Sequence, residues 1–322
     1  MSARSLPPHP FFLPMVSCPR RCVYCDQSGI TGISEAPSPA EVESVLADLV
    51  EPREVCFFGG SFTCFSEDLR KAYMDSVKAA PEGSVFRLST HPLCISGTIL
   101  DELSHRPVSM VEIGVSSLDD SVLAACNRGY TGEHALSVMV AILERGLPLG
   151  VQLMIGLPGQ SPGSELGDLE RIASLRKEEA SPGITLRLYP CLVLEGTRLA
   201  LMTKRGEYEP LSLEEAVSRA GEVLYKARRL GLAVQRVGLH ETESLSRSVI
   251  AGPHHPAFGE MAGSVALVKT LLETSPEGPW KVDERRMSFL LGHGRFGLRL
   301  LSRSTGIPLP RLRERIIFCK AL

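Results

Sequence analysis

The stretch EVCFFGGSFTCFSEDLRKAYMDSVKAA (54–80) contains the unit from which much of the chain is built. It begins with EVCFFGG, a short apolar and aromatic run that ends in two glycines and predicts a β-strand. The segment SEDLRKAYMDSVKAA follows after a few residues and predicts a helix. A strand followed closely by a helix is the building unit of parallel sheets.

The same unit recurs along the first 240 residues. Six strands are predicted before residue 191: FFLPMVS (11–17), EVCFFGG (54–60), VFRLST (85–90), VEIGVSS (111–117), LGVQLMIG (149–156) and ITLRLYP (184–190). Helices predicted between them include SPAEVESVLADLV (38–50), SEDLRKAYMDSVKAA (66–80), GEHALSVMVAILERG (132–146) and SELGDLERIASLRKEEA (164–180). This alternation implies a parallel sheet with right-handed crossovers.

Six units are too few for a complete eight-stranded barrel. A long amphipathic helix (212–230) and one more strand-like piece, AVQRVGL (233–239), follow the sixth unit. The expected fold is therefore α/β, a partial (β/α)6 TIM-like barrel over residues 1–240. Residues 241–322 are expected to form a basic, mostly helical C-terminal extension. In such barrels the chemistry lies at the carboxyl ends of the strands.

Composition is that of an ordinary globular protein, with 43% hydrophobic and 22% charged residues in 322. The apolar runs at 11–16 and 138–143 are too short to span a bilayer, so no membrane association is expected. The N-terminus shows no secretory signal. A cytoplasmic location with reduced thiols is the expectation.

The net charge of −2 hides an asymmetry between the two ends of the chain. Residues 281–320 contain ten Lys or Arg against three acidic residues, a charge of +7 that leaves −9 for the rest. A basic segment on an acidic body can mark a nucleic-acid contact. Charge alone favours the alternative, a solvated helix surface.

Three of the nine cysteines, Cys18, Cys22 and Cys25, are clustered as C-x3-C-x2-C just after the first predicted strand. A structural zinc site would need a fourth ligand, and no second C-x2-C pair exists, although His9 or Cys56 could serve singly. A four-iron cluster held by three cysteines would leave one iron for an exogenous molecule. The other six are expected to be isolated core or half-buried residues without a disulfide framework: Cys56, Cys64, Cys94, Cys126, Cys191 and Cys319.

The cysteine motif, with Tyr24 before its last cysteine, resembles that of the radical S-adenosylmethionine (SAM) superfamily. The resemblance implies that Cys18, Cys22 and Cys25 hold a 4Fe-4S cluster, and that Tyr24 lies at the cofactor site. In that family, SAM chelates the free iron, and the reduced cluster cleaves SAM to a 5′-deoxyadenosyl radical. A low-potential donor such as ferredoxin or flavodoxin would supply the electron.

A second motif, FFGGSFT (57–63), ends the second predicted strand. Glycines let the backbone approach a ligand closely, and carbonyls at a strand end can accept hydrogen bonds from an ammonium group. In the radical SAM family this position binds the SAM amino group, which implies that role for Gly59, Gly60 and Ser61.

Further motifs resemble a narrower branch, which contains the radical SAM domain of the Elongator catalytic subunit and oxygen-independent coproporphyrinogen oxidase-like proteins. They are RLSTHPL (87–93), VEIGVSSLDDSVLAACNRGYT (111–131), VQLMIGLPGQ (151–160) and LRLYPCLVLEGTRL (186–199). The resemblance spans about residues 10–240. It implies SAM contacts through Arg128 for the carboxylate, and through Ser89, Ser116 and Gln152 for the ribose.

Two charged residues stand in otherwise apolar predicted strands, Glu112 and Arg187. Each must be paired or directed into a polar cavity. Arg187 is a candidate for the cofactor site, with a structural ion pair as the equal alternative. His254-His255 is expected to pack in its GPHHP loop, with metal or substrate binding as the alternative. Tyr189 is expected either to line the substrate cavity or to pack.

This chain departs from the branch at several positions. It has Thr90-His91-Pro92-Leu93 where the branch often has Thr-Arg-Pro-Asp, and Ser116 where the branch often has Gln. It is not expected to contain an acetyltransferase domain, so the acetyl-CoA-dependent Elongator reaction is not expected.

The expected function is that of an enzyme that cleaves SAM reductively and starts radical chemistry on a substrate C–H bond. RNA, a tRNA in particular, is the leading substrate hypothesis. A small molecule, such as a porphyrin-like compound or coenzyme precursor, is the alternative. A non-catalytic carrier of a cluster or cofactor is a third possibility.

Overall fold

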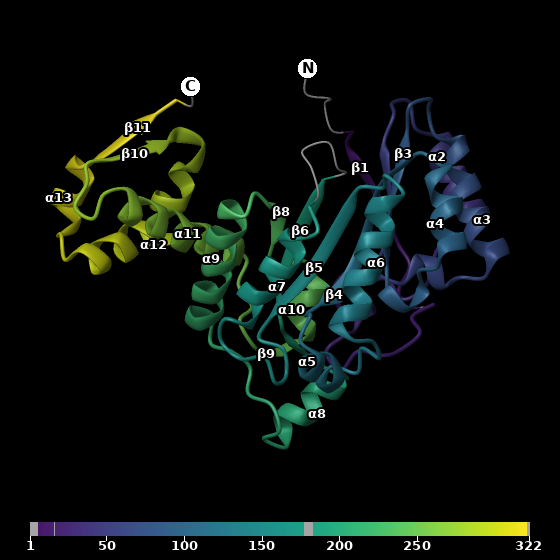
Figure 1. The fold of residues 1–322 in the computed structure, drawn as a ribbon, viewed down its shortest axis with the longest axis horizontal. Coiled ribbons are helices and arrows are strands. Elements are labelled where there is room, and N and C mark those ends of the chain that lie inside the picture. Colours follow the sequence, from purple (N-terminus) through teal and green to yellow (C-terminus); the bar gives the residue numbers. More distant parts are fainter. Residues whose placement is uncertain (1–5, 16, 177–182, 321–322) are drawn as a thin grey trace.

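The computed structural model describes residues 6–15, 17–176 and 183–320. Its centre is a curled sheet of seven parallel strands in the order β1-β2-β3-β4-β5-β6-β8 (Figure 1). Their bounds are β1 Pro8–Phe12, β2 Glu54–Phe58, β3 Val85–Thr90, β4 Val108–Ser116, β5 Leu149–Ile155, β6 Ile184–Pro190 and β8 Ala233–Val237. The α/β class and the partial barrel are confirmed, and the strand-like piece at 233–239 becomes the seventh strand.

Six helices connect these strands along the chain: α2 Pro39–Ala47, α3 Glu67–Ser76, α4 Gly97–Ser104, α6 Gly132–Glu144, α7 Ser164–Ala173 and α9 Leu213–Arg229. Several begin at a serine or threonine whose side chain accepts a backbone N–H of the first turn. Ser38 and Glu41 form a complete capping box at the start of α2. The helix predicted over 164–180 ends at Ala173, and its residues 177–180 lie outside the described residues.

The main core lies between the sheet and these helices. In β5, Leu149, Val151, Leu153 and Ile155 are buried in that core together with residues of α6 and α7. Because side chains alternate along a strand, the residues between them, such as Gln152, face the concave side of the sheet. The curvature therefore leaves an interior that polar and charged side chains can occupy.

Small elements follow the carboxyl ends of the strands. They are α1 Gln27–Thr31, α5 Asp120–Ala125, β7 Val193–Leu194, α8 Arg198–Lys204, α10 Glu243–Ser248 and β9 Val249–Ala251, with the 3-10 turns η1 Phe62–Cys64, η2 Val77–Ala79 and η3 Pro92–Cys94. The hydroxyls of Thr242 and Ser244 donate to the carbonyls of Ile30 and Gly29, at 2.8 Å each. The chain beyond residue 240 thus returns to the helix that follows the cysteine motif.

The remaining elements form a C-terminal unit with its own small core, residues 280–319. It contains the parallel pair β10 Trp280–Asp283 and β11 Ile316–Cys319, the turn η4 Glu284–Arg286, and the helices α12 Met287–Thr305 and α13 Leu309–Glu314. Helix α12 is broken by non-helical residues from Gly292 to Arg295. Helix α11, Phe258–Thr274, packs on both α9 and α12 and joins this unit to the barrel (Figure 1).

Two expectations about cysteines are wrong. Cys64 and Cys94 form a disulfide across 30 residues of sequence. They meet because β2 and β3 are neighbouring parallel strands, so the turns η1 and η3 after their ends lie side by side. Cys319 is exposed rather than buried, whereas Cys56, Cys126 and Cys191 are buried as expected.

No helix in the described part of the chain is long and apolar enough to cross a membrane.

Candidate active site

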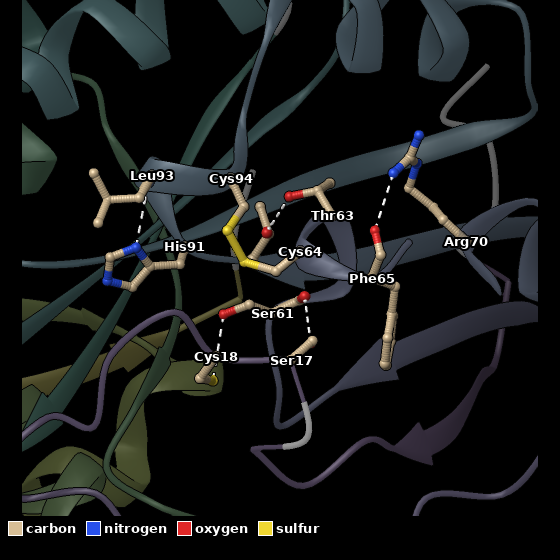
Figure 2. Close-up of a disulfide and its surroundings, with 11 residues drawn as sticks. Ser17, Cys18, Ser61, Thr63, Cys64, Phe65, Arg70, His91, Leu93 and Cys94 are labelled. Carbon is tan, nitrogen blue, oxygen red and sulfur yellow. Dashed lines mark hydrogen bonds between the residues drawn. A yellow bond between two sulfur atoms is a disulfide. The ribbon is translucent and has the colours of Figure 1, made fainter. Parts of the chain in front are cut away.

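The three clustered cysteines lie on the loop between β1 and α1, and each thiol has a different neighbour. Cys18 Sγ is 3.4 Å from Ser61 Oγ, as Figure 2 shows. Cys22 Sγ accepts a hydrogen bond from Nη1 of Arg128 at 2.9 Å. Cys25 Sγ accepts one from the Gln27 amide at 3.6 Å. Across the described residues, no group of three or more His, Cys, Asp or Glu side chains is arranged so that it could hold a metal ion.

Burial dominates the electrostatics of this loop. It raises the pKa of the Cys25 thiol to about 12, and the nearby Cys22 adds to the shift. Metal coordination by Cys25 would therefore have to displace a tightly held proton. Burial also raises the pKa of Tyr24, against the opposing charge of Arg128, so the phenol keeps its proton.

The glycine pair after β2 holds the cysteine loop against the sheet. A Cβ at Gly60 would collide with the carbonyl oxygen of Leu13, and Gly59 has a φ of +97°. Leu13 N–H donates to the Phe58 carbonyl at 2.7 Å, and Ser17 Oγ donates to the Ser61 carbonyl at 2.7 Å. The glycines thus allow the backbone after β2 to lie directly against the segment that leads from β1 into the cysteine loop.

Arg128 is buried and joins three parts of the site. Its Nε donates to Tyr130 Oη at 3.0 Å, Nη2 donates to the Gly114 carbonyl, and Nη1 reaches Cys22. A Cβ at Gly114 would lie 3.5 Å from Arg128 Nη2, an ordinary van der Waals distance, so the guanidinium packs directly against this position. The guanidinium is thereby fixed beside the cysteine loop.

Several non-glycine residues around the loop have a positive φ, which costs backbone energy. They are Met15 at 41°, Ser116 at 69° and Asn127 at 58°. Ser116 Oγ and Tyr24 Oη form a hydrogen bond of 2.6 Å. Such left-handed residues typically cluster at functional sites, where the surrounding structure holds them in place.

A second charged group lies in the concave interior of the sheet. Glu112, with 0% of its surface exposed, forms ion pairs with Arg87 and with Arg187 Nε, the latter at 2.9 Å. Ser89 Oγ donates to the same carboxylate at 3.4 Å. A Cβ at Gly150 would lie 2.7 Å from Glu112 Cγ, so this glycine makes space for the buried side chain.

Both arginines also contact one aromatic ring. The guanidinium carbons of Arg187 and Arg87 lie 5.1 and 5.9 Å from the centre of the Phe58 ring. Arg87 further pairs with Glu54 at 3.6 Å and donates to Gln235 at 2.6 Å. These contacts link β2, β3, β4, β6 and β8.

The structure thus brings most of the predicted residues into two neighbouring groups. One group surrounds the cysteines: Tyr24, Gly59, Gly60, Ser61, Ser116 and Arg128. The other surrounds Glu112: Ser89 and Arg187. Gln152 is paired with Gly114 in the sheet register, and its Oε1 would lie 4.0 Å from a Cβ there, which places it between the two groups.

Sequence reasoning missed Arg87, Glu54, Gln235 and Tyr130. Arg87 could have been found by the same signal as Glu112 and Arg187, because it too is a charged residue in an otherwise apolar predicted strand. Tyr189 is half-buried and forms a side-chain hydrogen bond with Arg187, so it belongs to this second group. The predicted histidine pair lies elsewhere: His254 Nε2 is 3.0 Å from Glu241 Oε2, and the ring of His255 is 4.4 Å from that of His293.

Comparison with known proteins identifies related families and folds. The model of the Radical SAM superfamily matches residues 12–172, and that of the Radical_SAM C-terminal domain matches residues 185–266. A tRNA uridine(34) acetyltransferase of Methanocaldococcus jannaschii is 32% identical over 135 residues, which cover 40% of this chain and 24% of that protein. The corresponding protein of Dehalococcoides mccartyi is 26% identical over 235 residues, covering 60% and 50%. The chain spans about a quarter to a half of the length of these two relatives.

Two solved structures share the fold. The archaeal Methanocaldococcus infernus Elp3 superposes with a TM-score of 0.60 at 19% identity, over 84% of this chain and 63% of that chain. Coproporphyrinogen III oxidase (HemN) from Escherichia coli, described as a radical SAM enzyme, superposes with a TM-score of 0.53 at 17% identity, over 70% and 54%. Both match the branch that the strand-end motifs resemble.

Proposed function

Because the chain belongs to the radical SAM superfamily, we propose that Cys18, Cys22 and Cys25 bind its 4Fe-4S cluster and that the enzyme acts on RNA. Enzymes of this superfamily use such a cluster together with SAM and need a reductant. The observation that carries the proposal is the set of three thiols on one strand-end loop beside a buried arginine. Soft thiolates are the ligands that iron–sulfur clusters require.

The residues around the cysteines fit the second cofactor. When bound, the cluster and SAM supply the electron transfer and the 5′-deoxyadenosyl radical. Arg128 would bind the SAM carboxylate, and its bonds to Tyr130 and Gly114 hold it in place independently of Cys22. The other proposed SAM contacts are Tyr24, Gly59, Gly60, Ser61, Ser89, Ser116, Gln152 and Arg187. Ferredoxin or flavodoxin is the proposed electron donor.

The proposal of an RNA substrate is supported by the surface of the C-terminal unit. Its ion pairs among the described residues involve Arg285 with Asp283, and Arg303 with Glu214 at 3.9 Å. Five other exposed arginines have no carboxylate at ion-pair distance within the described chain: Arg295, Arg299, Arg311, Arg313 and Arg315. Unpaired arginines on a surface favour a polyanionic partner.

A groove in the same unit combines charge with apolar surface. It has a volume of about 480 Å³ and is lined by Leu291, Arg295, Leu298, Arg313, Ile316 and Phe318. Single-stranded RNA presents phosphates for arginines and flat bases for apolar and aromatic side chains. The groove therefore fits unpaired nucleotides better than it fits the backbone of a duplex alone.

The activity is tested by anaerobic reconstitution with iron, sulfide, SAM and dithionite, followed by measurement of 5′-deoxyadenosine. Total RNA or a small-molecule extract of the source cells is then added. We expect RNA to stimulate SAM cleavage, and prior ribonuclease treatment to remove the stimulation. Stimulation by the small-molecule extract alone would assign a small substrate instead. A stably bound cluster without any SAM cleavage would indicate a cluster carrier.

RNA binding is tested separately with a fluorescent single-stranded oligouridine. Replacing Arg295 and Arg313 by alanine should weaken binding roughly tenfold, if each exposed charge contact contributes about 0.5–1 kcal/mol. The slope of log affinity against log salt should fall in magnitude by about 1.4, because each phosphate contact with a single strand contributes about 0.7.

Arg285→Ala provides the matched control, since it removes one exposed arginine of the same unit that is already paired with Asp283. If each arginine removed costs the same RNA affinity in the control as in the groove variant, the RNA is attracted by the overall positive charge of the unit and not bound in the groove. Preference for duplex RNA over the single strand would also contradict the groove. Point variants are preferred to deletion of residues 281–322. The deletion would expose the apolar residues of α11 that pack against the C-terminal unit, whereas the point changes leave them covered.

A further inference from the structure

The disulfide between Cys64 and Cys94 lies close to Ser61, the residue that contacts Cys18 (Figure 2). Cys64 ends the turn η1, and its N–H donates to the Ser61 carbonyl at 2.9 Å. Ser61 in turn meets Cys18 through Oγ at 3.4 Å and accepts from Ser17 at 2.7 Å. One side of the disulfide is therefore two contacts away from Cys18.

The other side of the disulfide leads to Cys22. The N–H of Cys94 donates to the His91 carbonyl at 3.0 Å, and the His91 ring meets the edge of Tyr130 with centroids 5.0 Å apart. Tyr130 accepts from Arg128, which donates to Cys22. Burial and the charge of Arg128 lower the pKa of His91 to about 3, so this ring stays neutral at physiological pH.

Both cysteines of the disulfide lie at partly exposed positions. Cys64 and Cys94 are half-buried. Leu93 and Ser96, on either side of Cys94 in the chain, are exposed. A hydrogen bond of 2.5 Å between the hydroxyls of Thr63 and Thr90 also joins the turn η1 to the end of β3, independently of the sulfur bond. The region around the disulfide therefore has a second contact between these two elements besides the sulfur bond.

We propose that Cys64 and Cys94 form a reversible dithiol–disulfide pair whose oxidation state sets how firmly the supports of Cys18 and Cys22 are held. The oxidant is a small disulfide of the glutathione class. One thiolate attacks it and releases one thiol, and the second thiolate then displaces the remaining half as a second thiol. Two electrons pass from the cysteine pair to the small disulfide, and the two protons lost by the cysteine thiols pass to the two released thiolates, which leave as thiols.

The test uses the reconstituted holoprotein under anaerobic conditions, in glutathione buffers that range from fully reduced to fully oxidised. Alkylation and peptide mass mapping give the fraction of Cys64 and Cys94 in the disulfide. In parallel, the rate of iron release to a chelator measures how tightly the cluster is held. We expect the pair to interconvert reversibly, and the disulfide form to release iron about tenfold more slowly, which corresponds to about 1.4 kcal/mol of local opening.

The double variant Cys64→Ser/Cys94→Ser should release iron at the rate of the reduced wild type in every buffer. Cys319→Ser, which removes an exposed free thiol of the C-terminal unit, should behave as the wild type. If the double variant does not fold, the proposal is still tested by comparing the iron-release rates of the reduced and the oxidised wild type. A pair that does not interconvert, or one that interconverts at an unchanged iron-release rate, overturns the proposal.

The proposal rests on the assignment of the cluster to Cys18, Cys22 and Cys25, and the two can fail separately. A chain that binds no iron contradicts the cluster assignment. The alkylation result still shows whether the Cys64–Cys94 pair is reversible.

Discussion

Replacement of Cys22 by serine is expected to leave a folded chain that binds no complete cluster and forms no 5′-deoxyadenosine above background. Serine keeps a hydrogen-bond acceptor for Arg128, which contacts the Cys22 sulfur at 2.9 Å in the wild type. The arginine and its neighbours should therefore stay in place. A hydroxyl is nevertheless a poor ligand for an iron–sulfur cluster, because thiolate is the form that binds.

The measurements are iron and sulfide content, the visible absorbance of the reconstituted protein, and chromatography of the reaction products. Cys319→Ser is the matched control, since it changes the same functional group on the exposed end of β11. Full cluster content in Cys22→Ser would remove this residue from the ligand set. Loss of the cluster in both variants would point to general instability during reconstitution.

Replacement of Glu112 by glutamine is expected to lower the free energy of unfolding by about 3–5 kcal/mol, the cost of leaving buried charges without their partner. The variant keeps the shape of the side chain but removes the negative charge that Arg87 and Arg187 share. Both arginines are largely buried, with 9% and 18% of their side-chain surface exposed, so water cannot replace the lost carboxylate well. Denaturant unfolding of the apoprotein measures the effect without any cofactor.

Glu54→Gln is the control for Glu112, since its carboxylate lies 3.6 Å from the same Arg87 but is 20% exposed. A smaller loss, about 1 kcal/mol, is expected there. In the double variant Glu112→Gln/Arg187→Met, one of the uncompensated charges is removed, and part of the lost stability should return. Equal losses for Glu112→Gln and Glu54→Gln would contradict a central role for Glu112 in this network.

The site was predictable to the extent that its chemistry is local in sequence. The spacing of Cys18, Cys22 and Cys25 and the two glycines after β2 lie in short continuous segments, and neither needs the fold to be recognised. The charge of Glu112 in an apolar strand showed that a partner must exist, but not that Arg87 and Arg187 share it. Which side chains meet across a curled sheet depends on strand order and curvature, which a single strand does not reveal.

In the C-terminal unit, the charge and the helices could be expected from the sequence, but the way the chain folds back on itself could not. Its basic charge could be counted from the sequence, and its helices were expected. The parallel pair of β10 and β11 was not, because the two strands are four residues each and lie far apart along the chain. The break in α12 contains His293 and Arg295 at positive φ values, which non-glycine residues seldom adopt and which the helical pattern of the sequence does not indicate.

The sequence by itself determined the alternation of strands and helices, the partial barrel, and the three-cysteine motif after the first strand. These features follow from apolar periodicity and from the residue spacing within one loop, which are properties of short segments. Only the tertiary structure decided that Cys64 meets Cys94, that Arg128 reaches Cys22, and that Glu112 is shared by two arginines. Each of these contacts joins side chains from different strands, and their distance is set by the packing of the whole sheet.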